Sequence, residues 1–184
     1  GLLTDRDDVV RAVAHPCHPS IFLQRTTAEE YADTFGGIAA PQDAIAAVES
    51  DDPAVRDLVE ATVRAIYAPV IDVHFVTIKQ LAQLEPTLVE TVACMIGALL
   101  NEALDEAIHT MGVPEPAARS ILYGHTQVAL ANGLRGDNPF SDACLIAMDY
   151  GRESIIKEDW KKIFRDDELD RNLARMLHLD HIER

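Results

Sequence analysis

Hydrophobic positions are spaced in two different ways along this chain. In residues 1–76, short apolar runs separated by turn residues have the lengths of buried strands. An amphipathic stretch between two of them predicts a helix that Asp52 caps and Pro53 begins. The expected strands are 9–14, 44–48 and 70–76, the expected helix is 53–68, and a helical turn at 27–32 and a turn at Gly36-Gly37 lie between the first two strands. This strand–helix–strand order is typical of the end of an α/β sheet.

From residue 77 to the C-terminus, the apolar residues have the spacing of α-helices. Thr77 and Gln80 have the spacing of a capping box, and one helical pattern continues from there to residue 111, with a kink expected at Pro86. Its apolar residues surround more than one face, so other helices or a second subunit must cover it. We therefore expect a homodimer.

The remaining apolar pattern predicts further helices up to the C-terminus. Gly124 and Gly133 are expected to interrupt one of them, and Gly151 is expected to close another. These helices are 116–134, 142–150, 158–164 and 167–179. The fold class is thus mainly α: a last α/β portion in 1–76, followed by an all-helical domain in 77–184.

Composition narrows the possible partners and the compartment. The 184 residues carry a formal net charge of −15, which argues against binding to nucleic acid phosphates. No apolar run approaches the roughly 20 residues needed to span a bilayer. The N-terminus lacks a signal peptide's basic lead, and three widely spaced cysteines imply no disulfide framework. We expect a cytoplasmic protein without membrane partners. The sequence does not begin with Met, from which we expect processing or truncation.

The sequence H-P-C-H-P at 15–19 is the strongest chemical signal, because it places two imidazoles and a thiol at the mouth of a predicted strand. Histidine carries protons near neutral pH and binds zinc-like ions. Two prolines stiffen the loop. The alternative is that both imidazoles only hydrogen-bond to backbone carbonyls. Cys17 is expected to be a small buried residue, not a ligand.

A nucleotide-binding α/β domain opens with a glycine-rich turn, G-x-G-x-x-G, and this sequence contains none. The expected strands are also fewer than such a domain uses. These residues by themselves are therefore not expected to hold a dinucleotide.

Five motifs in register resemble the D-apionate oxidoisomerase-like oxidoreductases of the 6-phosphogluconate dehydrogenase-like superfamily. They are H-P-C-H-P at 15–19, F-G-G-I-A-A-P-Q-D at 35–43, V-T-I-K-Q-L-A-Q-L-E-P at 76–86, P-F-S-D-A-C at 139–144 and K-E-D-W-K-K at 157–162. The resemblance implies a Rossmann domain followed by a helical domain for substrate binding and dimerisation. It implies NAD or NADP as cofactor and a hydroxylated, apionate-like sugar acid as substrate. Residues 1–76 then match the end of a truncated Rossmann domain.

The resemblance also places the active site at the His loop and the start of the long helix. His15, His18 and Glu85 would bind a divalent metal such as zinc, or shuttle the proton of the substrate alcohol. We expect them to converge on a pocket between the two parts of the chain; the alternative for Glu85 is a solvated carboxylate. Lys79 is a candidate general base, although Gln83 breaks the K-x-x-x-N pattern of related branches and an exposed lysine is the alternative.

Four further residues are candidates for substrate binding. His125 and Gln127 could reach a substrate hydroxyl or carboxylate, although His125 could equally be a core histidine between helices. Ser141 and Asp142 could do the same, although an N-cap is the simpler interpretation.

Three functions from different classes are compatible with these observations. The first is the substrate-binding and dimerising part of an NAD(P)-dependent oxidoreductase. The second, which the missing glycine-rich turn favours, is a helical dimerisation or binding module without turnover. A metal-dependent hydrolase would need more ligands than the sequence offers. Titration with NAD discriminates between the first two.

Overall fold

The computed structural model describes residues 10–18 and 41–182, and the chain divides into two compact units, Gly1–Leu84 and Glu85–Arg184. We call these the first and the second unit. The turns expected at 27–32 and Gly36-Gly37 lie outside the described residues. We predicted a division at residue 76, where the strands end and the helices begin. The two units, which are defined by the contacts within each of them, divide after Leu84 instead. The first turns of the long helix therefore belong to the first unit.

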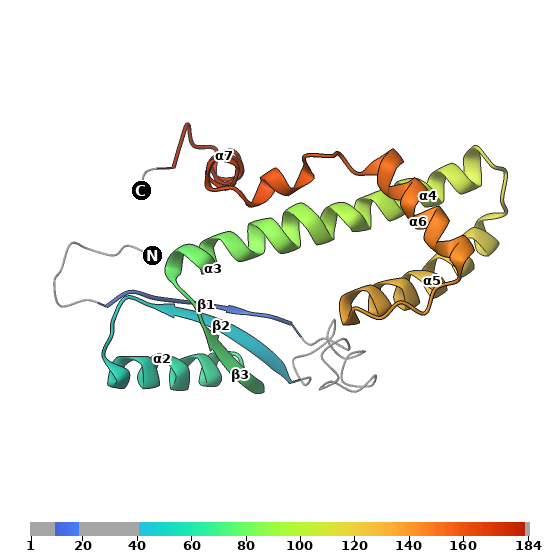
Figure 1. Ribbon diagram of the computed structural model, residues 1–184. Helices are drawn as coiled ribbons and strands as arrows, with labels where there is room; N and C mark the ends of the chain where they lie inside the picture. Colours follow the sequence, from blue (N-terminus) through green and yellow to red (C-terminus); the bar gives the residue numbers. More distant parts are fainter. Residues whose placement is uncertain (1–9, 19–40, 183–184) are drawn as a thin grey trace. The chain divides into compact units, whose positions relative to one another are not determined.

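The described part of the first unit is a three-stranded sheet with helices α2 and α3 (Figure 1). The strand order is β1-β2-β3, for β1 (Ala12–Pro16), β2 (Gln42–Val48) and β3 (Val70–Phe75). β2 and β3 are parallel and connected through α2 (Pro53–Ile66), while β1 runs antiparallel to β2. The expected α/β arrangement is therefore present, with an antiparallel edge strand.

One face of this sheet holds the core of the first unit. Ala44 and Ala46 of β2 are fully buried against Val63 of α2. Alanine is a weak strand former, but a small side chain allows a helix to approach the sheet closely, and packing outweighs the local preference. Residues that alternate with these two along β2 point to the opposite face.

The first strand begins and ends later than predicted. We expected 9–14, but β1 spans Ala12–Pro16 and includes His15. Proline lacks a backbone donor and is tolerated on an edge strand, which is the position of Pro16 in this sheet. The two imidazoles therefore do not share one loop: His15 belongs to the strand and His18 follows it.

Both predicted helix starts in this region are confirmed. The Asp52 side chain accepts a hydrogen bond from the Ala54 N–H at the start of α2. Thr77 and Gln80 form the reciprocal capping box, with distances of 2.9 and 3.1 Å between backbone nitrogens and side-chain oxygens. This box starts α3 (Ile78–Leu84).

The long helical pattern is one helix over Ile78–His109, but it is not α-helical throughout. α3 passes into a π-helical stretch, η3 (Glu85–Cys94), and then into α4 (Met95–His109). Pro86 has no N–H for the α-helical ladder, and the Thr91 hydroxyl donates to the Pro86 carbonyl over 2.6 Å. We predicted a kink at Pro86, and what the structure has there is a change of helix type.

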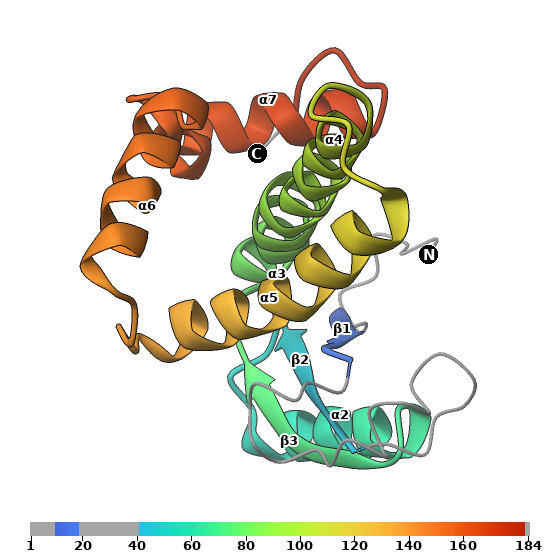
Figure 2. The ribbon, with the colours of Figure 1, turned by 90° about the vertical axis from the view of Figure 1, so that its right-hand side faces the viewer.

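The second unit continues with α5 (Glu115–Arg135), α6 (Asp142–Ile155), a 3-10 helix η4 (Trp160–Phe164) and α7 (Asp166–Met176). α5 runs back alongside α4, as Figures 1 and 2 show. Two glycine predictions are wrong: α5 passes through Gly124 and Gly133, and α6 continues beyond Gly151. An isolated glycine costs a helix only about 1 kcal/mol, which is too little to end one.

By length and composition alone, the helix Ile78–His109 could cross a membrane, contrary to our expectation from apolar runs. Only 11% of its most apolar window is buried in this structure. The core helix of a soluble protein passes the same test, but such a helix is mostly buried, which this window is not among the described residues. The uncharged stretch 91–101 between Glu90 and Glu102 is about half the length that a bilayer requires.

Candidate functional site

The histidine segment lies at the edge of the first unit's sheet. His15 is half-buried in β1, directly opposite Ile45 of β2. His18 is exposed and has φ of +60°, a left-handed conformation that is uncommon for residues other than glycine. His178 has the same conformation, with φ of +56°, just after α7, where it ends a helix. The backbone of His18 is thus unusual, but its conformation is not by itself a functional signature.

Cys17, between these histidines, is exposed as a whole residue, contrary to expectation, although its thiol is partly covered by the protein. Its backbone N–H donates to the Asp43 carbonyl over 2.9 Å. Partial burial of the thiol, and to a lesser extent the charge of Asp43, raise the pKa of Cys17. A thiol whose pKa is raised is a poor nucleophile and a poor soft ligand at neutral pH, which agrees with leaving Cys17 out of the ligand set.

Two histidines lie in one row of paired residues that crosses the sheet, on the face opposite α2. His15 pairs with Ile45, and Ile45 pairs with His74 of β3, so all three side chains point to one face. The Nε2 atom of His74 lies 3.2 Å from Oδ2 of Asp43. Asp43 is only 7% exposed, while the His74 side chain is 55% exposed. The face thus carries a nearly buried carboxylate that holds a solvent-facing imidazole.

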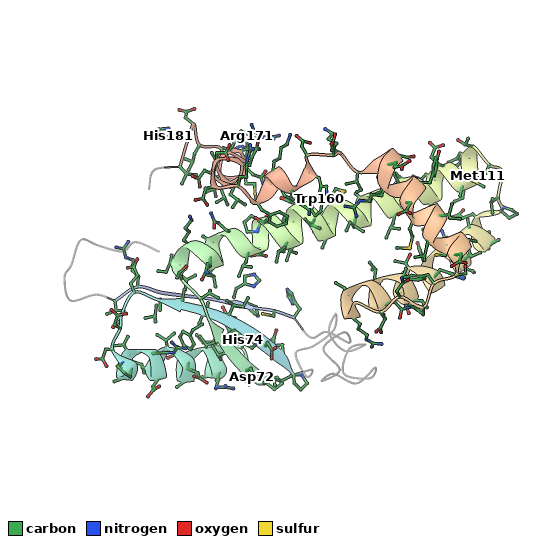
Figure 3. The ribbon with its side chains drawn as sticks, in the orientation of Figure 1. Asp72, His74, Met111, Trp160, Arg171 and His181 are labelled. Atoms are coloured by element: carbon green, nitrogen blue, oxygen red, sulfur yellow. The ribbon has the colours of Figure 1, made fainter. Side chains whose placement is uncertain are left out.

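Sequence reasoning missed this Asp43–His74 pair, although a signal was available. In V-I-D-V-H-F at 70–75, the polar residues Asp72 and His74 alternate with apolar ones, which predicts a strand with one polar face. Figure 3 shows both side chains on β3. The partner of His74 could not have been read from the sequence, because Asp43 lies on another strand.

The arrangement can hold a proton at a defined atom. In the tautomer that carries its hydrogen on Nε2, His74 donates a hydrogen bond to Asp43 Oδ2, and the lone pair of Nδ1 is left as an acceptor. A carboxylate in this position fixes the tautomer and orientation of the ring, as in other acid–base pairs. The geometry therefore suits general acid–base chemistry.

The metal prediction joins residues of both units. His15 and His18 belong to the first unit, whereas Glu85 is half-buried at the start of η3 in the second. Within the described residues, no three His, Cys, Asp or Glu side chains form a group that could hold a metal. The ligand set and its convergence between the units therefore stay predictions. Lys79 lies in the first turn of α3 and is exposed, as the alternative interpretation of an exposed lysine expected. Its role as a general base stays a prediction.

Of the two candidates on α5, Gln127 lines a cavity of about 400 Å³ between α4 and α5, and His125 is not among its lining residues. Gln127 lines it with Asn101, Tyr123 and Thr126, which the sequence did not single out. His125 is exposed and not the core histidine of the alternative. Its Nδ1 lies 2.8 Å from the Ile121 carbonyl and donates to it, so Nε2 can accept a proton or a hydrogen bond.

The simpler interpretation of Ser141 is confirmed. Its hydroxyl accepts a hydrogen bond of 3.3 Å from the Cys144 N–H, which makes it the N-cap of α6. Asp142 is exposed in the first turn of that helix, where a carboxylate interacts favourably with the helix dipole. A role of either residue in substrate binding stays a prediction.

Comparison with known proteins relates these features to one family. Residues 23–177 match the family described as the C-terminal domain of phosphogluconate dehydrogenase (decarboxylating). The chain is 61% identical, over its full length, to a D-apionate oxidoisomerase of Pectobacterium atrosepticum. It is 41% identical over 97% of its length to one of Blautia hydrogenotrophica. The chain spans 65% and 63% of the lengths of these relatives.

A solved structure has the same fold. It is a semialdehyde dehydrogenase NAD-binding protein from Cupriavidus necator in complex with calcium and NAD, with a TM-score of 0.83 and 38% sequence identity. The match covers 94% of this chain and 63% of that one. The mainly helical fold class expected from the sequence is thereby confirmed.

Proposed function

Because this chain belongs to the phosphogluconate dehydrogenase (decarboxylating) C-terminal family, we propose that it is the substrate-binding and dimerising part of an NAD(P)-dependent oxidoreductase. Its substrate is a hydroxylated, apionate-like sugar acid. The observation that carries the proposal is the 61% identity to a D-apionate oxidoisomerase along the whole chain. NAD as the cofactor is supported by the NAD complex of the similar structure.

The reaction proposed is hydride transfer. A substrate alcohol gives a hydride to the nicotinamide ring and a proton to a base, and becomes a carbonyl. Histidine suits the base, because its pKa lies near neutral pH. His15 and His18 are the proposed proton carriers with Glu85, and Lys79 is a further candidate base. His125, Gln127, Ser141 and Asp142 are proposed to contact the sugar acid.

The residues present do not hold the phosphates of a dinucleotide. The sequence contains no glycine-rich G-x-G-x-x-G turn, and β2, α2 and β3 form one strand–helix–strand repeat without such a turn. NAD or NADP would therefore be bound through residues additional to these 184.

A divalent metal is a separate part of the proposal. Imidazole nitrogens with one carboxylate suit zinc, whereas calcium prefers oxygen ligands, so the calcium ion in the similar structure does not support the His pair as its ligands. If a metal binds at His15, His18 and Glu85, it would supply Lewis acidity to polarise the substrate carbonyl.

The second unit supports the proposal of a homodimer. Its buried apolar side chains, among the described residues, are Leu104, Ala118 and Ala174. Large apolar side chains remain exposed, including Ile121 at 62%, Ile146 at 70% and Tyr150 at 71%. Figure 2 shows α6 apart from α4. A surface of this kind is typical of a subunit interface, and we propose that a second copy covers it.

The test joins this chain to the part of the P. atrosepticum relative that it does not cover. We expect the chimaera to reduce NAD in the presence of D-apionate, and His18→Ala to lower kcat by about a hundredfold. His109→Ala, an exposed histidine at the end of α4, is the matched control. Failure of a folded, NAD-binding chimaera to oxidise sugar acids would contradict the proposal.

The missing glycine-rich turn favours a second candidate function, a non-catalytic helical dimerisation or binding module. Neither function predicts NAD binding by these 184 residues alone, so the chimaera discriminates between them, and oxidation of D-apionate by the chimaera would support the oxidoreductase. An inactive chimaera that still dimerises would support the module.

A further inference from the structure

The second unit contains a positively charged cavity that the proposed function does not use. It has a volume of about 180 Å³ and lies where η3, η4 and α7 meet. Glu168, Arg171, Asn172 and Arg175 are spaced as neighbours on one face of α7, and that face lines the cavity. Figure 3 shows Arg171 on this helix.

The charge of the lining is opposite to that of the whole chain. Arg171, Arg175 and Lys162 line the cavity with a single carboxylate, Glu168, although the chain has 31 acidic and 16 basic residues. A cationic pocket on a protein of net charge −15 is not a consequence of composition. Two of these three cations are paired with carboxylates, so the lining keeps one positive charge in excess, and a bound anion would neutralise it.

The cations differ in how far their charges are already neutralised. Arg171 is paired with Glu168, and Lys162 Nζ lies 2.7 Å from Asp159 Oδ2 on the exposed side of η4. For Arg175, by contrast, the described part of the chain provides no carboxylate within ion-pair distance. Arginine presents a planar fork of N–H donors that matches a carboxylate or a phosphate, so Arg175 is the residue most available to an anion.

Two threonine hydroxyls of η3 and the Asn172 amide of α7 complete the lining of the cavity. Asn172 donates to the Thr91 hydroxyl over 3.1 Å, and that hydroxyl in turn donates to the Pro86 carbonyl. Thr87 is only 6% exposed, and it lines the cavity from η3. A threonine hydroxyl can donate a hydrogen bond to an oxyanion, so Thr87 adds a neutral donor to the cations of the lining.

We propose that this cavity binds the oxyanion of a small organic acid or phosphate, with Arg175 as the main contact, assisted by Lys162 and the Thr87 hydroxyl. The volume is several times the roughly 30 Å³ that a water molecule occupies in the liquid, so a small anion fits and a nucleotide does not. The site requires neither NAD nor hydride transfer, and it would exist in a non-catalytic module as well.

Binding can be followed in the unmodified chain through Trp160, its one tryptophan, which lies in η4 beside the cavity-lining segment. Titrations with inorganic phosphate and with D-gluconate distinguish a phosphate site from a carboxylate site. Saturable binding of either anion, with erythritol as the uncharged control, is the expected result. The absence of saturable binding by both anions, in fluorescence and in calorimetry, would overturn the proposal.

Variants assign the binding to this cavity. Arg175→Gln should weaken the binding about tenfold or more, because a charge-assisted hydrogen bond is lost. Arg175→Lys should retain part of it, since the charge remains but the fork does not. Arg152→Gln removes an exposed arginine from α6 and should have no effect. Equal affinities of Arg175→Gln and the unmodified chain, with unchanged circular dichroism, would show that the anion binds elsewhere and would overturn the assignment.

Discussion

His74 and Asp43 are held together across two neighbouring parallel strands, with 3.2 Å between Nε2 and Oδ2. The carboxylate is nearly buried and the imidazole is half-exposed, so the carboxylate orders a ring that remains accessible to solvent. This pair belongs to the same sheet face as His15, which the sequence had already singled out.

We expect Asp43→Asn to destabilise the first unit by about 1 kcal/mol, because the side chain keeps its shape but loses the carboxylate that contacts His74. Amide hydrogen exchange of the peptide 42–48 measures this locally, and protection should fall about fivefold. Trp160 lies in the second unit and does not report on this change. Asp57→Asn, at an exposed position of α2, is the control; an equal effect of both variants would contradict a specific role of the pair.

The raised pKa of Cys17 predicts slow alkylation at neutral pH. A thiol reacts as the thiolate, so the midpoint of its pH–rate profile should lie above that of an ordinary cysteine. Asp43→Asn should lower this midpoint only in part, because burial, the larger cause, remains. Iodoacetamide labelling of the Cys17 peptide, followed by mass spectrometry, measures the profile. A midpoint at or below the ordinary value would contradict the structure.

Replacement of Ser141 separates its structural role from the predicted substrate contact. Ser141→Ala removes the N-cap of α6 and should cost about 1 kcal/mol of stability. Ser154→Ala, near the end of the same helix, should be close to neutral. Urea unfolding followed by circular dichroism compares the two. A decrease in sugar-acid affinity of the chimaera without a loss of stability would instead support substrate binding.

The proposed homodimer predicts a strong effect of charge on the exposed face of α6. Ile146→Glu should dissociate the dimer, because a carboxylate would be buried at the interface without a partner. Ile66→Glu on α2 is matched in residue type and exposure, 67% against 70%, and should leave the dimer intact. Multi-angle light scattering after gel filtration gives the mass of each. A monomeric unmodified chain would refute the dimer.

The metal prediction is tested by measuring the zinc content of the purified chain and its variants. If His18 and Glu85 are ligands, His18→Ala and Glu85→Ala should each lower the zinc content of the purified chain severalfold, and His109→Ala should not. Binding should also weaken below neutral pH, since imidazole must be unprotonated to bind a metal. Inductively coupled plasma mass spectrometry measures the content. The same content in all variants would exclude these ligands.

The helices followed from the sequence because their signals are local. Asp52, Thr77 and Ser141 each accept a hydrogen bond from a backbone amide within three residues, so spacing alone identifies such a cap. The interruptions predicted at Gly124 and Gly133 and the helix end predicted at Gly151 were wrong, because one glycine's cost is smaller than the gain from continuing a helix.

What the tertiary structure decided is which distant residues become neighbours. Asp43 meets His74 across a strand pair, and Arg175 lines one cavity with Lys162 and Thr87, although neither set has a recognisable spacing. Strand register and helix packing bring these groups together, and both depend on the summed burial of apolar surface over many residues. The sequence by itself therefore determined the helices, their caps and the family resemblance, while the acid–base pair and the cationic cavity arise from long-range packing.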